Sequence, residues 1–341
     1  MELPLIVGVD GSPASLRALD WAVDEAVRRG APLRIVHASS WEWYEGHEPS
    51  FGIGEESVRA AADRVVAGAL ERVGSRAPAV AVTGVVLPED PAAALIRESR
   101  QAGVVVVGSR GRGQFAGLLL GSVSLSVAAH AASPVVVVRD TGAVPDTGVV
   151  PDAESVRNPE TVRNPETVRS SETVRSSEPV RNPEPVRDTE SPRHAEGDRP
   201  AAEVTVGVGD PQESAAAVAF ACDAAQRRGI ALRAVRTWRC PAHEAPDRPR
   251  AAALPDLHQA RAQEELDEAL RGPLRAHRAL MVRRDVLEGH ARTALLDAAH
   301  TSELLVVGAR RRKGHLGMQL GPVNHAVLHH APCPVAVVPH D

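Results

Sequence analysis

Short, almost wholly apolar runs alternate along the chain with longer amphipathic stretches. The first apolar run, residues 3–9, is typical of a buried parallel strand. An amphipathic stretch over 13–29 follows, with Ser12 placed to cap a helix and Gly30 placed to end it. The same reasoning predicts strands at 33–38, 80–87, 104–107 and 135–138, and helices at 55–74, about 91–103 and 121–131. This βαβαβαβαβ order predicts a parallel sheet with helices on both faces.

The pattern occurs twice. The run V-V-V-V-G at 104–108 returns as L-L-V-V-G at 304–308, and H-A-A-S-P-V-V-V-V at 130–138 returns as H-A-P-C-P-V-A-V-V at 330–338. A tandem duplication explains these matches simply. It predicts one domain over residues 1–140 and a second over residues 201–341.

The intervening segment, residues 141–200, has a different pattern. Glu recurs every six residues from Glu154 to Glu190, and the repeated unit reads roughly E-T-V-R-N-P. One apolar residue in six buries no face, and the Asn-Pro and Glu-Pro steps break helices. Composition therefore predicts a disordered linker. A left-handed β-helix also uses six-residue repeats, but it needs small or apolar residues at further positions and more coils.

Composition supports two domains joined by a linker. The chain has 341 residues, of which 43% are hydrophobic but only 2% aromatic, so Ala, Val, Leu and Ile must fill the core. A net charge of −5 predicts no broad nucleic-acid surface. Pro4 interrupts the first apolar run and Asp10 ends it, so we expect neither a signal peptide nor a membrane span. We expect a cytoplasmic protein.

The three cysteines predict no disulfide framework. Cys222, Cys240 and Cys333 form no C-x-x-C pair. In a cytoplasmic protein such thiols stay reduced. We expect inert or partly buried thiols.

The loop after the strand at 104–107 carries the most chemical information. It contains the spacing Gly108-x2-Gly111-x9-Gly121-Ser122. It is not a Walker A loop, because no Gly-Lys-Ser/Thr follows. Glycines let the backbone approach a ligand closely, and successive N–H groups form an anion nest. The N–H groups that open the next helix would then make a phosphate site.

These residues, the G-V-D-G-S start at 8–12 and the duplication make the chain resemble the universal stress protein family in its tandem-domain form. The resemblance implies two Rossmann-like domains, each a five-stranded parallel sheet in the order 3-2-1-4-5. It implies ATP, with or without Mg²⁺, at the carboxyl ends of strands one and four. It also implies that the two domains pair through their last strands. A homodimer and an unidentified protein partner are further options.

The resemblance assigns roles to particular residues. Gly8 and Asp10 would lie beside the ribose and adenine, and Ala38 near the base. The sugar and phosphates would be wrapped by Val107, Gly108, Ser109, Arg110, Gly111, Arg112 and Gly113. The triphosphate would be held by Gly121, Ser122, Val123 and Ser124. Alternatives remain open: Asp10 also suits a turn, and the two arginines also suit a solvated loop.

The second copy departs from the motif. Gly308 and Gly321 keep the spacing, but Arg311 and Pro322 replace the second glycine and the serine. Gly209 stands where the first copy has its acid at the end of strand one. Pro322 removes an N–H donor, and Arg311 adds a side chain where the backbone must approach closely. We therefore predict tight ATP binding in the first domain only.

Two clusters in the second copy leave alternatives open. The basic run 310–313 is an alternative phosphate site. His325 and His329 are spaced for zinc on a predicted helix, with His330 and Cys333 close by. The sequence H-A-P-C-P also resembles the ordinary ending of the family, which favours a structural role.

No residue set is spaced for nucleophilic or acid–base catalysis. We therefore expect an ATP-binding stress-response or signalling module and not an enzyme. The alternatives are a nucleotide-independent dimerisation or scaffold protein of the same fold, and a slow ATPase or phosphate-transferring enzyme.

Overall fold

The computed structural model describes residues 2–39, 55–111, 120–139, 202–240, 254–310 and 320–340. We call the described residues up to 139 the N-lobe and those from 202 onward the C-lobe. The expected disordered linker, 141–200, lies outside the described residues, as do Arg112, Gly113 and Arg311.

Each lobe is built from alternating strands and helices. The N-lobe comprises β1 (Leu5–Gly8), α1 (Pro13–Arg29), β2 (Leu33–Ala38), α2 (Glu55–Arg76), β3 (Val82–Leu87), α3 (Pro91–Glu98), the 3₁₀ turn η2 (Ser99–Gln101), β4 (Val104–Gly108), α4 (Ser122–His130) and β5 (Val135–Val138). The C-lobe comprises β6 (Glu203–Gly207), α5 (Pro211–Arg228), β7 (Ala231–Trp238), α6 (Leu254–Ala276), β8 (Val282–Glu288), α7 (Ala291–Ala299), β9 (Ser302–Arg310), α8 (Pro322–His330) and β10 (Val335–His340).

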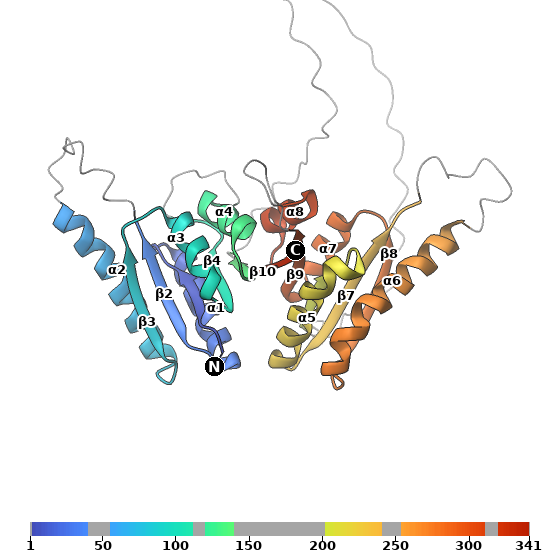
Figure 1. Ribbon diagram of the computed structural model, residues 1–341, viewed down its shortest axis with the longest axis horizontal. Helices are drawn as coiled ribbons and strands as arrows, with labels where there is room; N and C mark the ends of the chain where they lie inside the picture. Colours follow the sequence, from blue (N-terminus) through green and yellow to red (C-terminus); the bar gives the residue numbers. More distant parts are fainter. Residues whose placement is uncertain are drawn as a thin grey trace, which may run out of the picture. The chain divides into compact units, whose positions relative to one another are not determined.

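The strands that the structure describes form one ten-stranded sheet, in the order β3-β2-β1-β4-β5-β10-β9-β6-β7-β8 (Figure 1). Each lobe contributes five parallel strands in the order 3-2-1-4-5, which confirms the predicted topology. The lobes meet at β5 and β10, which pair antiparallel with Val136 opposite Ala336. The expected pairing of the two last strands is thus present within one chain.

Side chains of each sheet face pack under a different pair of helices. In the N-lobe, Leu5 and Val7 of β1 join the core that includes α1 and α2. Ile6, between them, joins the core that includes α3 and α4. Because strand side chains alternate in direction, an unbroken apolar strand is buried on both faces. This explains why β4 is a run of valines in a chain with few aromatics.

One predicted helix was too long. The helix expected to run from about 91 to 103 ends at Glu98 and tightens into the 3₁₀ turn. The Ser99 hydroxyl donates to Ile96 O (2.6 Å) and accepts from the N–H of Ala132 (2.8 Å). These two bonds tie the end of the helix to the segment before β5.

No helix in the described part of the chain is long and apolar enough to cross a membrane.

Candidate functional site

A cavity of ≈ 380 Å³ lies in the N-lobe where β1 and β4 end. In a doubly wound sheet this is the switch point, where neighbouring connections leave on opposite faces and open a crevice. Most of the predicted site residues line it: Gly8, Asp10, Ala38, Val107, Gly108, Arg110, Gly111, Gly121, Ser122, Val123 and Ser124.

Asp10 occupies the turn between β1 and α1. Its Oδ1 accepts from the N–H of Ser12 (2.9 Å), and its own N–H donates to Ser15 Oγ (3.3 Å). Gly11 between them has φ 78°, a left-handed conformation that favours glycine. Ser12 caps α1 by accepting from the N–H of Ser15 (3.2 Å). The turn role foreseen for Asp10 is therefore present, and its second carboxylate oxygen still borders the cavity.

Two glycines of the loop fit because they carry no side chain. A Cβ on Gly111 would lie 2.7 Å from Asp10 Oδ2. A Cβ on Gly108 would lie 2.7 Å from the backbone C and O of Ala14 in the first turn of α1. The loop backbone thus packs directly against α1 and brings the ends of β1 and β4 together.

Three of the predicted phosphate-binding groups are used by the protein itself. The N–H of Gly121 donates to Ser109 O (2.7 Å), and the Ser124 hydroxyl donates to Gly108 O (2.6 Å). Ser109 is buried and does not line the cavity, because its N–H extends the sheet to Val138 O (2.8 Å). Its predicted contact with the ligand stays a prediction. These contacts shape the loop instead.

The donors that remain lie at the start of α4. The N–H groups of Ser122 and Val123 in its first turn have no partner among the described residues. Arg110 is exposed beside the cavity and makes no ion pair with any described residue. The pKa of Arg139 lies below its ordinary value because of burial and the nearby charge of Arg110. The helix start and Arg110 together make this end of the cavity attractive to an anion.

Several residues of the cavity were not among the predicted site residues. The additional lining residues are Val9, Ser15, Val36, Pro91 and Leu95. Ser15 had a signal, since it follows the helix cap by three residues. Leu95 had none, because it comes from α3: a Cβ on Gly8 would meet its Cδ1 at 2.8 Å, a contact that only the fold creates.

The C-lobe has a cavity of ≈ 360 Å³ at the equivalent place. Four apolar residues of its wall are identical to their N-lobe counterparts. The equivalent pairs are Val36 and Val235, Leu95 and Leu295, Val107 and Val307, and Val123 and Val323. Thr237 and Ala291 stand where the N-lobe has Ala38 and Pro91, so the two apolar slots are similar but not identical.

The polar end of the C-lobe cavity differs. Glu213 forms an ion pair with Arg310 (3.4 Å), the counterpart of the N-lobe's open Arg110. Asn324 replaces a serine and donates to Gly308 O (2.9 Å). Strand β9 continues past this glycine to pair Arg310 with His340, so its loop leaves the sheet two residues later than in the N-lobe. The C-lobe cavity thus has the Glu213 carboxylate beside its arginine, whereas Arg110 in the N-lobe pairs with no acid among the described residues.

The histidine cluster is not arranged around a metal. The rings of His325 and His329 stack with centroids 5.7 Å apart. Burial and the positive charges of His325, His330 and Arg139 hold the pKa of His329 below its usual value. No group of three or more His, Cys, Asp or Glu gathers as metal ligands among the residues the structure describes.

Two of the three cysteines lie in the interior of the C-lobe. Cys222 and Cys333 are buried, and Cys240 is partly exposed. Burial raises the pKa of Cys222 to about 11 and that of Cys333 to about 12. Both are therefore neutral near pH 7, as the sequence led us to expect.

These features define a class of protein: two doubly wound α/β lobes in tandem, each with a cavity at its switch point. Both copies match one family model, the universal stress protein family, over residues 3–139 and 202–339. The chain therefore belongs to the universal stress protein family.

Relatives and solved structures agree with this assignment. A universal stress protein of Mycobacterium tuberculosis is 30% identical over 342 residues, covering 98% of this chain and 96% of the relative. A universal stress protein of Mycolicibacterium smegmatis is 44% identical over 143 residues, but the match spans only 40% of this chain and 46% of that relative. The crystal structure of a universal stress protein from Archaeoglobus fulgidus is 15% identical, with a TM-score of 0.59 over 99% of this chain and 98% of that one. It supports the fold.

Proposed function

We propose that the N-lobe binds ATP and that the chain acts in the cytoplasm as a nucleotide-dependent stress-response or signalling module, without rapid turnover. The observation that carries this proposal is that Asp10, with Gly111 packed against it, lines the same cavity as the N–H groups at the start of α4, which have no partner among the described residues. One apolar slot therefore has both a carboxylate and an anion-attracting helix start in its lining.

The residues of this cavity fit the parts of ATP. Val36 and Val107 offer apolar contact to a base, and Asp10 Oδ2 is an acceptor for ribose hydroxyls. Ser122 and Arg110 offer donors to the phosphates. Mg²⁺ is usually bound through one or two carboxylates together with substrate phosphates, and Asp10 is the carboxylate that lines this cavity.

We further propose that the C-lobe binds ATP weakly. Glu213 repels phosphate and neutralises Arg310, while Pro322 offers no N–H at the start of α8. Gly209 supplies no carboxylate. Each lost contact costs about 1–3 kcal/mol, so the affinity should be lower by about a hundredfold or more.

Calorimetry with ATP on the full-length protein tests both statements. Mass spectrometry of nucleotide retained after purification is a second, independent test for a bound nucleotide. We expect a stoichiometry near one. Gly111→Arg with Ser122→Pro copies the second loop into the first and should abolish binding. Two equivalent sites would refute the C-lobe statement. No binding at all would favour a nucleotide-independent scaffold, and steady phosphate release would favour a slow ATPase.

A further inference from the structure

Helices α1 and α5 face each other across the lobe junction with near two-fold symmetry. Their left-handed caps, Gly30 and Gly229, are equivalent, so equivalent positions differ by 199. Arg29 lies over the ring of Phe220 at 5.4 Å, and its counterpart Arg228 lies over the ring of Trp21 at 5.7 Å. Trp21 and Phe220 are also counterparts. Each lobe thus places an arginine over an aromatic ring of the other.

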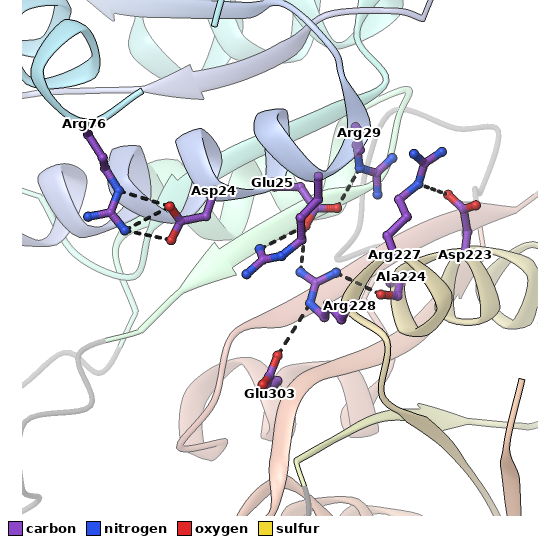
Figure 2. Close-up of polar contacts among 10 residues, drawn as sticks. Asp24, Glu25, Arg29, Arg76, Asp223, Ala224, Arg227, Arg228 and Glu303 are labelled. Carbon is purple, nitrogen blue, oxygen red and sulfur yellow. Dashed lines mark hydrogen bonds and ion pairs between the residues drawn. The ribbon is translucent and has the colours of Figure 1, made fainter. Parts of the chain in front are cut away.

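The symmetry is broken at one buried charge. Glu25 is only 1% exposed, and its counterpart is Ala224, which is fully buried. Glu25 accepts from Arg29 of its own helix (Nε to Oε1, 2.6 Å) and from Arg228 of the other lobe (Nη2 to Oε2, 2.7 Å), as Figure 2 shows. Arg28 of the same helix lies 3.8 Å from the same carboxylate. One carboxylate therefore bonds to the symmetry-related pair Arg29 and Arg228, which exact symmetry would provide with two carboxylates.

Arg228 depends on that carboxylate. Its side chain is 4% exposed, and burial lowers its pKa while Glu25 opposes the shift. Its other contacts are Ala224 O at 3.1 Å and the half-exposed Glu303 at 3.8 Å (Figure 2). A buried guanidinium without a close carboxylate is strongly unfavourable.

The two lobes also differ in residue size at the junction. At the centre of the strand pairing, Val136 of the N-lobe lies opposite Ala336 of the C-lobe, and both are fully buried. At each of these junction positions the N-lobe carries the larger residue and the C-lobe the smaller. The equivalent pairs are Trp21 and Phe220, Glu25 and Ala224, and Val136 and Ala336.

We propose that this junction selects unlike lobes: the N-lobe surface fits a C-lobe, and neither lobe pairs with a copy of itself. Two C-lobes would bury two copies of Arg228 with no carboxylate at the position of Ala224. Two N-lobes would place a second Glu25 and a second Trp21 where the space is shaped for Ala224 and Phe220, and overpacking of a core is costly.

The occupant of the N-lobe surface is the C-lobe of the same chain. The salt bridge of Arg227 to Glu2 (3.2 Å) and the bond from Arg139 to Leu328 O (2.6 Å) also cross between the lobes within the chain. A covalent tether raises the effective concentration of the chain's own C-lobe far above that of a second molecule.

A protease site inserted into the segment 141–200 makes this testable, because the full chain is folded first and cut afterwards. We expect the cut halves to stay together in size-exclusion chromatography with light scattering. Glu25→Ala should raise their dissociation constant by roughly a hundredfold or more. Asp24→Ala is the matched control, since it removes the neighbouring Asp24–Arg76 ion pair (2.8 Å), which lies within the N-lobe (Figure 2).

A relocated carboxylate separates selection from a general loss of stability. In Glu25→Ala, adding Ala224→Glu places an acid one turn before Arg228, as Glu25 stands before Arg29, and should restore association to within about tenfold of the wild type. Glu25→Gln keeps the shape of the side chain and removes its charge, so it replaces Glu25→Ala in this test if the alanine variant fails to fold. Wild-type affinity in Glu25→Ala, or no rescue, would refute the role of this charge.

Mixing tests the selection itself. Cut protein with a tag on its N-lobe half is unfolded in urea with an equal amount of untagged cut protein and refolded. We expect the tag to capture C-lobe halves and no untagged N-lobe halves. Capture of untagged N-lobe halves in similar amounts would overturn the proposal.

Discussion

Asp10 and Gly111 lie so close that a methyl group on Gly111 would stand 2.7 Å from Asp10 Oδ2. The other carboxylate oxygen is held by the N–H of Ser12 (2.9 Å), so the side chain turns away only by breaking that bond. The carboxylate is thereby oriented before any ligand arrives. An oriented group binds with a smaller loss of freedom than a mobile one.

We predict that Gly111→Ala lowers the affinity for ATP about tenfold, because the methyl group displaces the Asp10 carboxylate. Calorimetry measures the affinity, and thermal unfolding should show little change. Gly68→Ala in α2 is the control, since a Cβ there meets nothing within 4 Å. An unchanged affinity in Gly111→Ala would mean that the contact does not shape the site.

Equivalent glycines of the two lobes should respond differently to the same substitution. Gly108→Ala should destabilise the protein by about 1–3 kcal/mol, because its Cβ would lie 2.7 Å from the Ala14 backbone, which shifts less easily than a side chain. Gly308→Ala should change stability by less than about 0.5 kcal/mol, since the nearest atom, Glu213 O, is 3.6 Å away. Urea unfolding compares the two, and equal effects would contradict the packing difference.

Apolar periodicity predicted the alternation of strands and helices, and the family resemblance that the glycine spacing helps to carry implied the strand order and most of the cavity residues. Neither predicted the contacts inside the loop. Ser109 and Gly121 bond to each other and Ser109 also bonds to β5, contacts that depend on the folded sheet. Gly121 still lines the cavity, whereas Ser109 does not.

The pairing of the last strands was expected, but the buried charge at the lobe junction was not. A glutamate on an amphipathic helix normally indicates a solvated position. Glu25 is buried only because a second lobe brings Arg228 to it. Its departure from symmetry becomes visible once Ala224 is known to be its counterpart.

We predict that the free energy of unfolding falls in alkaline solution, because the buried thiols ionise more readily in the unfolded chain than in the folded one. Cys333 has its pKa raised to about 12, whereas an unfolded thiol titrates near about 8.5. Above that lower value the unfolded chain loses a proton that the folded chain keeps. The contribution to stability is therefore complete below about pH 8.5 and is lost as the pH rises toward 12.

Urea midpoints measured at pH 8 and at about pH 10.5 check this prediction. Cys333→Ala should show a smaller decrease between the two than the wild type does. Cys240→Ala, at a partly exposed thiol, should behave as the wild type. An identical decrease in Cys333→Ala would assign the alkaline effect to other groups.

Lysines at the centre of the junction should separate the lobes without removing the nucleotide site. Val136→Lys with Ala336→Lys places two positive charges opposite each other at fully buried positions of the antiparallel pair. The radius of gyration from small-angle scattering should rise while circular dichroism stays near that of the wild type. Thr83→Lys on β3, an exposed strand position, is the control.

Nucleotide binding by the same double variant then tests whether the ATP site of the N-lobe depends on the junction. The residues proposed to bind ATP come from β1, β2, β4, α4 and the loops that follow the strands, and Val136 and Ala336 are not among the residues lining the cavity. We therefore expect the separated protein to keep one ATP per chain. Loss of binding with folded lobes would show that the junction supports the site. An unchanged radius would show that the strand pairing is not what holds the lobes together.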